Sequence, residues 1–196
     1  MTLPLDPSPA PPAPAALPWI YPLDEFYARA GLSLPRIERI TGDEVPEPYR
    51  TLLVHKNDMT PTLEEFYRCD IHLEVLRSEQ RGDFYFREVV LRLNDSERPV
   101  EFGANKISLR LFAAPIRRVI LEERVPLGHI LKTSNVPHHG SPKAYLRVET
   151  DALMNRAFGL TGPTLLYGRR NTIWDPEERP LSEIVEILPP FPAPEH

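Results

Sequence analysis

The clearest pattern along the chain is an alternation of apolar and polar residues that begins near residue 71. Apolar side chains recur at every second position in IHLEVLRS (71–78), in FYFREVVLRL (84–93) and between residues 100 and 111. A period of two is typical of strands that bury one face. The first two runs are joined by Arg-Gly-Asp, which suits a tight turn. The pattern therefore predicts three successive antiparallel strands.

A second pair of strands is predicted near the C-terminus. The segment from Tyr167 to Trp174 is rich in strand-forming residues, and another apolar run extends from Leu181 to Leu188. The residues between them, DPEERP, are turn formers, so the two runs are expected to form a hairpin. Strands that pair with their neighbours in sequence, while helices are kept apart, indicate an antiparallel α+β domain.

Helices are expected where capping residues precede apolar residues at helical spacing. Asp24 can cap a short helix that Gly31 and Pro35 limit, and Thr60 followed by Pro61 predicts the start of another. The other expected segments are an extended piece at 52–54, short helical pieces at 115–124 and 126–132, and a loop at 134–142 with the sequence SNVPHHGSP. The helical segments fall outside the strand runs, in keeping with the α+β class.

The composition is that of one folded domain behind a proline-rich beginning. The chain has 196 residues, of which 41% are hydrophobic, enough for a single domain with its own core. Residues 1–18, MTLPLDPSPAPPAPAALP, lack periodicity, so an extended or disordered leader is expected there. We favour a spacer over a docking segment for this leader. The ordered domain is expected to cover residues 19–196.

Charge and hydropathy exclude several classes of function. The net charge of −5 at pH 7 provides no broad basic surface, so nucleic acid is not an expected partner. The longest apolar runs fall far short of the roughly 20 residues that a membrane span needs. The N-terminus lacks the basic and apolar regions of a secretory signal, so a cytoplasmic location is expected. The oligomeric state stays open, and a monomer is compatible with the sequence.

The sequence has few features that would bind a metal ion or a cofactor. Cys69 is the only cysteine, so neither an internal disulfide nor a multi-cysteine zinc cage can form. His138 and His139 are adjacent in a predicted loop, where their side chains diverge instead of gripping one ion. Glycine motifs for phosphate or dinucleotide binding do not occur either. We therefore expect no metal and no cofactor.

Two charged residues fall within apolar strand runs. Arg87 lies in mid-strand among apolar neighbours, and a guanidinium buried there must find an anion. That anion is either an internal carboxylate, from Glu101 or Glu186, or the carboxylate of a bound ligand. Glu186 itself lies between Val185 and Ile187. Burial would raise the pKa of such a carboxyl group unless a cation lies close, and a raised pKa suits a general acid.

An arginine pair in the predicted strand LYGRRNTI is unusual in a segment patterned for burial. Neighbouring side chains of a strand point to opposite faces, so Arg169 and Arg170 cannot enter the same pocket. We expect one of them to pair with an acid such as Glu88, as a brace behind the site, and the other to be solvated. Direct contact with a ligand is the less favoured alternative.

Five short motifs resemble the chorismate pyruvate-lyase family and occur in that family's order. They are NDMT at 57–60, FREVVL at 86–91, VPLGHIL at 125–131, LYGRRNTI at 166–173 and RPLSEIVEILP at 179–189. Each motif alone is weak, but five in order are far less expected by chance. The chain departs from the family pattern at His129, which follows Pro-Leu-Gly, and at Tyr167, which replaces a tryptophan.

The resemblance implies a fold, an activity and a set of site residues. The fold would be a sheet of about six antiparallel strands with helices over one face, enclosing an internal ligand pocket. The enzyme would convert chorismate to 4-hydroxybenzoate and pyruvate without metal or cofactor. Arg87 would hold the ring carboxylate, and Glu186 would meet the other end of the ligand as proton donor. Leu127 would contact the ligand through its backbone, and Met59 would line a flap over the pocket.

Two alternatives stay open. An ungapped alignment from Pro180 places the family's glutamate at Val185 instead of Glu186, on the opposite face of the strand. The architecture also resembles effector-sensing domains of bacterial transcription regulators, which bind small acids without converting them. A helix-turn-helix would mark a regulator, and the short leader is expected to leave no room for one. A non-catalytic binding module for a small aromatic acid is therefore the second hypothesis.

Overall fold

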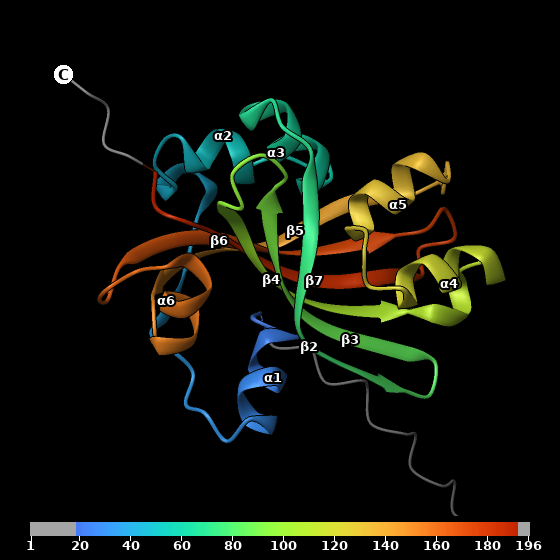
Figure 1. Cartoon of the computed structure of the whole chain (residues 1–196), viewed down its shortest axis with the longest axis horizontal. Coiled ribbons are helices and arrows are strands. Elements are labelled where there is room, and N and C mark those ends of the chain that lie inside the picture. Colours follow the sequence, from blue (N-terminus) through green and yellow to red (C-terminus); the bar gives the residue numbers. More distant parts are fainter. Residues whose placement is uncertain (1–18, 192–196) are drawn as a thin grey trace, which may run out of the picture.

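The computed structural model describes residues 19–191, which form one antiparallel sheet flanked by helices (Figure 1). The sheet has seven strands in the order β1-β5-β6-β7-β4-β3-β2. The strands are β1 (Ile37–Ile40), β2 (Ile71–Arg81), β3 (Phe84–Leu93), β4 (Pro99–Ser108), β5 (His139–Glu149), β6 (Leu165–Trp174) and β7 (Pro180–Leu188). The pairings β2–β3, β3–β4 and β6–β7 are the ones that the alternating patterns predict.

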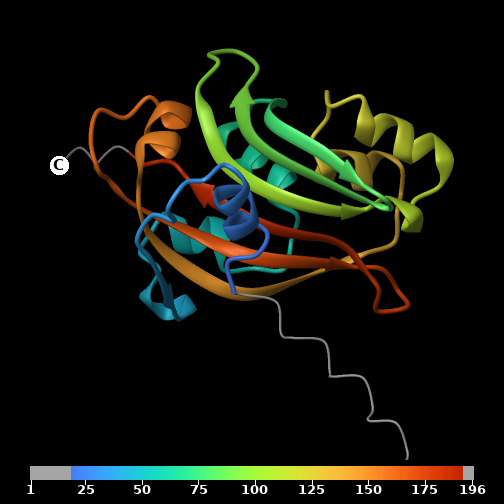
Figure 2. The same cartoon turned by 90° about the horizontal axis from the view of Figure 1, so that it is seen from below.

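Short helices cover both faces of this sheet. They are α1 (Leu23–Arg29), α2 (Tyr49–Leu53), α3 (Met59–Tyr67), α4 (Ala114–Leu121), α5 (Leu127–Thr133) and α6 (Ala152–Phe158). Figure 1 shows α2 and α3 on one side of the strands and α1 and α6 on the other. The view from below in Figure 2 brings α1 in front of the sheet. No helix within residues 19–191 is long and apolar enough to cross a membrane.

The two faces of the sheet have separate cores. We call the face that carries Phe86, Glu88 and Val90 the outer face, and the face that carries Arg87 and Val89 the inner face. Side chains of α1 and α6 join the apolar core of the outer face. Side chains of α2, α3, α4 and α5 join two clusters on the inner face. The inner face therefore lies beneath α3 and α5, which begin at the predicted ligand residues Met59 and Leu127.

The expected α+β class and antiparallel sheet are confirmed. Two details differ, because the sheet has seven strands instead of about six and its helices lie on both faces instead of one. The central strands β3, β4 and β7 are buried along almost their whole length. Strands that are apolar on both faces need cover on both sides, which the two groups of helices supply.

Some predicted boundaries were wrong. Residues 52–54 were expected to be extended, but Leu52 and Leu53 belong to helix α2 and are buried with Tyr49. The spacing i, i+3, i+4 is that of a helix face, and a run of three apolar residues is too short to reveal it. Helix α3 begins at Met59 with Asp58 in the N-cap position, so Thr60 is not the cap.

Three elements were missing from the prediction, namely β1, β5 and α6. Strand β5 starts at His139, inside the expected loop, and its register shifts between Pro142 and Ala144. A bulge of this kind accommodates the proline and glycine that indicated a turn. The strand expected to reach Leu111 ends at Ser108, before a 3₁₀ turn. The predicted leader, residues 1–18, lies outside the described residues.

Candidate functional site

A pocket lies between the inner face of the sheet and the starts of helices α3 and α5. The space between its lining side chains, counted together with the open solvent that adjoins it, is about 430 Å³. Its lining residues are Asp58, Met59, Thr60, Leu73, Arg87, Val89, Leu91, Glu101, Asn105, Pro126, Leu127, Gly128, Asn171, Ile173, Ile184 and Glu186. Mostly apolar pockets with a few convergent polar groups are typical sites for small molecules.

Strand register gathers the polar groups in two adjacent rows across the sheet. The first row crosses β3, β4, β7 and β6 through Arg87, Asn105, Ile184 and Asn171. The second row, two residues further along, passes through Val89, Gly103, Glu186 and Arg169. Alternate residues of a strand share a face, so both rows lie on the inner face. Neighbouring strands that are distant in sequence thus build one polar floor.

Arg87 is a buried cation that forms no ion pair with any residue from 19 to 191. Its side chain is almost fully enclosed, with 1% of the residue exposed. Its Nε and Nη1 atoms find no hydrogen-bond acceptor in the part of the chain that the structure describes. The internal salt bridge to Glu186 or Glu101, considered from the sequence, is not formed. Burial lowers the pKa of Arg87 to about 10, against the opposing influence of Tyr85 and Glu123.

Glu101 is a buried carboxyl group, also without an ion pair. Only 4% of the residue is exposed, and its Oε2 atom has no hydrogen-bond partner within residues 19–191. Burial raises the pKa of Glu101 well above its ordinary value. The nearby charge of Glu186 raises it further, while Arg169 acts in the opposite direction. The uncharged form of this carboxyl group is therefore favoured over a wider pH range than usual.

Gly103 makes room for that carboxyl group. A Cβ atom at this position would lie 3.0 Å from Oε1 of Glu101 and 3.2 Å from Cγ2 of Val89. Such distances are shorter than ordinary van der Waals contacts, so a larger residue would displace the carboxyl group. The glycine thus allows Glu101 to lie over the second row, beside Glu186.

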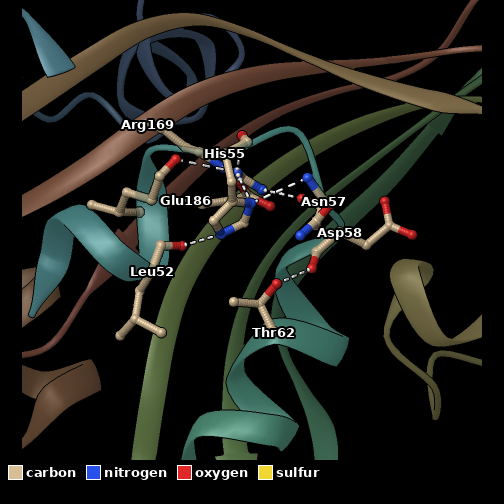
Figure 3. Close-up of polar contacts among 8 residues, drawn as sticks. Leu52, His55, Asn57, Asp58, Thr62, Arg169 and Glu186 are labelled. Carbon is tan, nitrogen blue, oxygen red and sulfur yellow. Dashed lines mark hydrogen bonds and ion pairs between the residues drawn. The ribbon is translucent and has the colours of Figure 1, made fainter.

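Arg169 braces the segment that leads into α3 (Figure 3). Its Nε donates to Oε2 of Glu186 at 2.5 Å. Its terminal nitrogens donate to the carbonyl oxygens of Leu53, His55 and Asn57 at 3.3, 3.0 and 3.1 Å. One guanidinium therefore fixes the backbone from residue 53 to residue 57. Because Asp58 and Met59 follow directly, this brace positions one wall of the pocket.

His55 completes the brace in its neutral form. The Nε2 atom lies 2.7 Å from the carbonyl oxygen of Leu52, to which it can donate. The Nδ1 atom then accepts from the backbone N–H of Asn57 at 3.1 Å and faces Arg169 at 3.3 Å. Burial and, secondly, the charge of Arg169 lower the pKa of His55. A neutral ring with one donor and one acceptor satisfies all of these contacts.

The expected surroundings of Arg169 and Arg170, an ion pair with Glu88 for one and solvent for the other, were wrong. Both arginines are buried, and neither pairs with Glu88, which pairs with Arg77 instead. Arg169 pairs with Glu186 on the inner face, and Arg170 pairs with Glu183 at 2.6 Å on the outer face. The predicted division between opposite faces is correct. The pattern of one strand could not reveal the partners, because they lie on β7.

The structure brings the four predicted site residues together. Met59, Arg87, Leu127 and Glu186 all line the same pocket. Val185, the alternative to Glu186, belongs to the core of the outer face. Glu186 forms an ion pair with Arg169, so the buried carboxyl group without a close cation that was considered for the proton donor is not found at Glu186.

Three polar residues on the strands that line the pocket were not proposed as ligand contacts from the sequence. Glu101 was considered only as a partner for Arg87, and Asn105 and Asn171 were given no role. In the described structure, the Oδ1 atoms of both asparagines lack a hydrogen-bond donor. The available signal was the spacing of Glu101, Gly103 and Asn105, which puts three non-apolar residues on one face of a strand.

The histidines singled out from the sequence make separate contacts. His138 lies 2.8 Å from Asp58, which raises the pKa of His138. His129 lies 3.7 Å from Glu64, and His139 lies 3.6 Å from the exposed Glu178. Residues 19–191 contain no group of three or more His, Cys, Asp or Glu side chains placed to hold a metal ion. His138 therefore links the start of α3 to the segment after α5.

Comparison of the sequence with known families gives no assignment. No family model matches the chain. No curated protein matches it in sequence at a significant level.

Comparison with solved structures does reveal the fold. PhnF from Mycobacterium smegmatis is similar with a TM-score of 0.51 and 9% identity, over 85% of this chain and 92% of that chain. The effector domain of PhnF gives 0.50 and 10%, over 67% and 88%. A GntR-family transcriptional regulator from Bacillus cereus gives 0.46 and 10%, over 64% and 97%.

At these identities the likeness concerns the fold alone. The described residues share the α+β fold of PhnF and its effector domain, which is also the chorismate lyase-like fold expected from the motifs. A fold of this kind does not decide between binding and catalysis.

Proposed function

We propose that this chain binds a small organic acid in the inner-face pocket and acts as a ligand-sensing module. The observation that carries the proposal is Arg87, a fully buried guanidinium with no acidic partner in the described chain. An unpaired buried charge is costly, and a ligand carboxylate would remove that cost. Arginine also offers the planar fork that matches a carboxylate.

The apolar residues of the pocket favour an acid with an apolar body. Leu73, Val89, Leu91, Ile173 and Ile184 line the pocket beside its polar groups. A flat ring between these side chains would bury its faces in apolar contacts. An aromatic monocarboxylate, such as 4-hydroxybenzoate, fits this distribution of polar and apolar groups.

A similar structure is the reason to place sensing first, although the shared fold itself is compatible with both binding and catalysis. That structure is the effector domain of PhnF, and the present chain covers 88% of it. A sensing module needs a site with a few fixed contacts. The contacts of Arg169 with Glu186 and with the segment before α3 provide a fixed wall of this kind.

A second candidate is a lyase that removes pyruvate from chorismate. In that elimination a ring proton leaves, the carbon–oxygen bond to the enolpyruvyl group breaks, and the released enolpyruvate takes up a proton to become pyruvate. One group must accept a proton and another must donate one. The ion-paired Glu186 and the unpaired Glu101 are two carboxyl groups of opposite character in one pocket. These two carboxyl groups are the observation that supports the lyase as the second candidate.

Calorimetric titration with 4-hydroxybenzoate tests the binding proposal. Replacing Arg87 by Met should weaken binding by about 2–5 kcal/mol, since one partner of a buried charge pair is removed. The matched control is Arg92→Met, on the same strand but outside the pocket, where the side chain pairs with Glu74. The control should bind like the wild type. Equal affinity of the Arg87→Met protein would overturn the assignment.

A turnover assay separates the two candidates. The purified protein is incubated with chorismate, and 4-hydroxybenzoate is measured against a protein-free control. Product formation above that control would establish the lyase. Tight binding of 4-hydroxybenzoate without product formation would establish the sensing module. A wild-type protein that neither binds nor converts either compound would reject both.

A further inference from the structure

We propose that Glu101 takes part in ligand recognition as an uncharged carboxyl group, donating a hydrogen bond to an oxygen of the ligand at the end remote from its carboxylate. This inference rests on the proposed binding of an organic acid at Arg87. It names the second polar contact of that ligand and predicts which acids the pocket selects.

The first argument is the separation of the two polar groups. Glu101 lies opposite Leu91 in the sheet, four residues beyond Arg87 on β3. Four residues of a strand span about 13 Å. The guanidinium of Arg87 faces Tyr85 and Glu123, whereas Glu101 faces Glu186. The carboxyl group of Glu101 extends back over the row of Val89 and Gly103, so it lies beyond the row of Arg87 along the strand direction. A ligand that contacts Arg87 at one end can therefore reach Glu101 at its other end.

The second argument is the distribution of charge at the far end. Two buried carboxyl groups, Glu101 and Glu186, share one cation, Arg169. Arg169 is committed to Glu186 and to three backbone carbonyl groups. Glu101 is left without a cation among the described residues. The negative charge of the nearby Glu186 then disfavours a second negative charge on Glu101. Its uncharged form carries an O–H donor, which matches the unpaired Oε2 atom.

The third argument concerns the other groups around the pocket. The charged lining groups are Glu186 on β7, Arg87 on β3 and Asp58 at the N-cap of α3, with Arg169 on β6 behind Glu186. Asp58 is already paired with His138 at 2.8 Å. The lining residues from β2 and α5 are uncharged. Within the described residues, Arg87 is the one lining cation without an ion pair, and it forms no ion pair with Glu101 and is assigned to the carboxylate of the ligand.

A consequence is selection for acids with an accepting oxygen opposite the carboxylate. A hydroxyl or methoxy oxygen can accept from Glu101, a hydrogen atom cannot, and an aromatic amine is a poor acceptor. Benzoate, which keeps the Arg87 contact alone, would leave the buried O–H without a partner. A site built to pair a polar group rejects ligands that leave it unpaired.

The test is a titration of four acids into wild type, Glu101→Gln and Glu101→Leu. The acids are benzoate, 4-hydroxybenzoate, 4-methoxybenzoate and 4-aminobenzoate. Wild type should prefer the hydroxy and methoxy acids over benzoate by about tenfold. The Gln variant keeps an N–H donor and should retain most of this preference. The Leu variant should lose it while binding benzoate as well as wild type does.

The dependence on pH sharpens the same test. The preference of wild type for 4-methoxybenzoate over benzoate should decline as the pH rises and Glu101 loses its proton. The Gln variant has no proton to lose, so its preference should stay constant. 4-Methoxybenzoate is used because its ether oxygen does not ionise.

The outcomes separate this inference from the proposed function. If benzoate and 4-hydroxybenzoate bind but their affinity ratio is the same in wild type and the Leu variant, the role of Glu101 is refuted and acid binding at Arg87 stands. A preference for 4-aminobenzoate that increases with pH would also refute it, because it would identify Glu101 as a charged acceptor. If none of the four acids binds wild type, both proposals fail.

Discussion

Buried charged side chains differ in their ion pairing between the two faces of the sheet. On the outer face, Glu183 pairs with both Arg170 and Lys106, at 2.6 and 3.2 Å, and Glu88 pairs with Arg77. On the inner face Arg169 pairs with Glu186, but Arg87 and Glu101 have no oppositely charged partner among residues 19–191. Charged residues of both faces border pockets, but those of the outer face are ion-paired there, whereas Arg87 and Glu101 form no ion pair within the described residues.

This difference separates polar groups that serve the fold from polar groups kept for a ligand. A buried charge with its partner in place is tolerated, while one without a partner lowers stability. Unpaired buried charges are found chiefly at functional sites, where binding or catalysis requires them in spite of the lower stability. Substitutions of paired and of unpaired buried charges should therefore change stability in opposite directions, and each of the following experiments tests one part of that contrast.

The largest effect is expected for Arg169→Met. The substitution leaves Glu186 buried without its cation and removes donors from three backbone carbonyl groups. Loss of one partner of a buried pair costs about 3–5 kcal/mol of unfolding free energy. Urea unfolding followed by circular dichroism measures this loss.

The outer-face counterpart, Arg170→Met, is the matched comparison. Glu183 would keep Lys106 as a second cation, so the loss should be smaller than for Arg169. If Arg170→Met proved the more damaging of the two, the ion pair at Arg169 would not be the main brace of the inner face.

The opposite sign is expected for Arg87→Met. The variant replaces an unpaired buried guanidinium by an apolar side chain of similar length. Unfolding free energy should rise by about 1–3 kcal/mol, while binding of the acid is lost. Thermal and urea unfolding without ligand would show the gain. A clear loss of stability would mean that Arg87 serves the fold, as the paired arginines do.

Strand periodicity was enough to predict much of this sheet, and its failures have physical causes. The hairpins made of β2, β3, β6 and β7 alternate cleanly over long runs. Strand β5 does not, because Gly140 and Pro142 fall at its beginning. Strand β1 has only four residues, too few to establish a period.

The candidate site was predictable in its faces but not in its pairs. Periodicity placed Arg169 and Arg170 on opposite faces, as observed, and the family resemblance placed Arg87 and Glu186 in one pocket, whose lining contains both. The partner of each charge depends on the pairing of β4, β6 and β7, which are not all neighbours in sequence. For this reason the sequence could not indicate that Glu186 is paired and that Glu101 is not.

A smaller, pH-dependent gain is expected for Glu101→Gln. Burial raises the pKa of Glu101 above its ordinary value of 4.5. The folded state therefore holds this proton more tightly than the unfolded state, and wild-type stability declines as pH rises from about 4.5 through the raised pKa. The Glu101→Gln variant lacks this decline. Its unfolding free energy should therefore exceed that of wild type only slightly near pH 4.5 and by about 1 kcal/mol in alkaline solution. Unfolding curves across this range would reveal a flat difference if Glu101 were charged throughout.

The smallest effect concerns His138, a paired group at the edge of the pocket. Its hydrogen bond with Asp58 raises the pKa of His138 above the ordinary value of 6.5, although burial acts in the opposite direction. The pair should therefore contribute its full stabilisation below about pH 6.5, and this stabilisation should be lost as pH rises through the pKa of the folded state. His138→Asn should cost up to about 1 kcal/mol at pH 6 and less at pH 9. The adjacent His139→Asn, whose contact with Glu178 is exposed, should change stability at neither pH. A cost at His138 that increases with pH would show that the neutral ring is the stabilising form, and the pair would then no longer count among the charges that serve the fold.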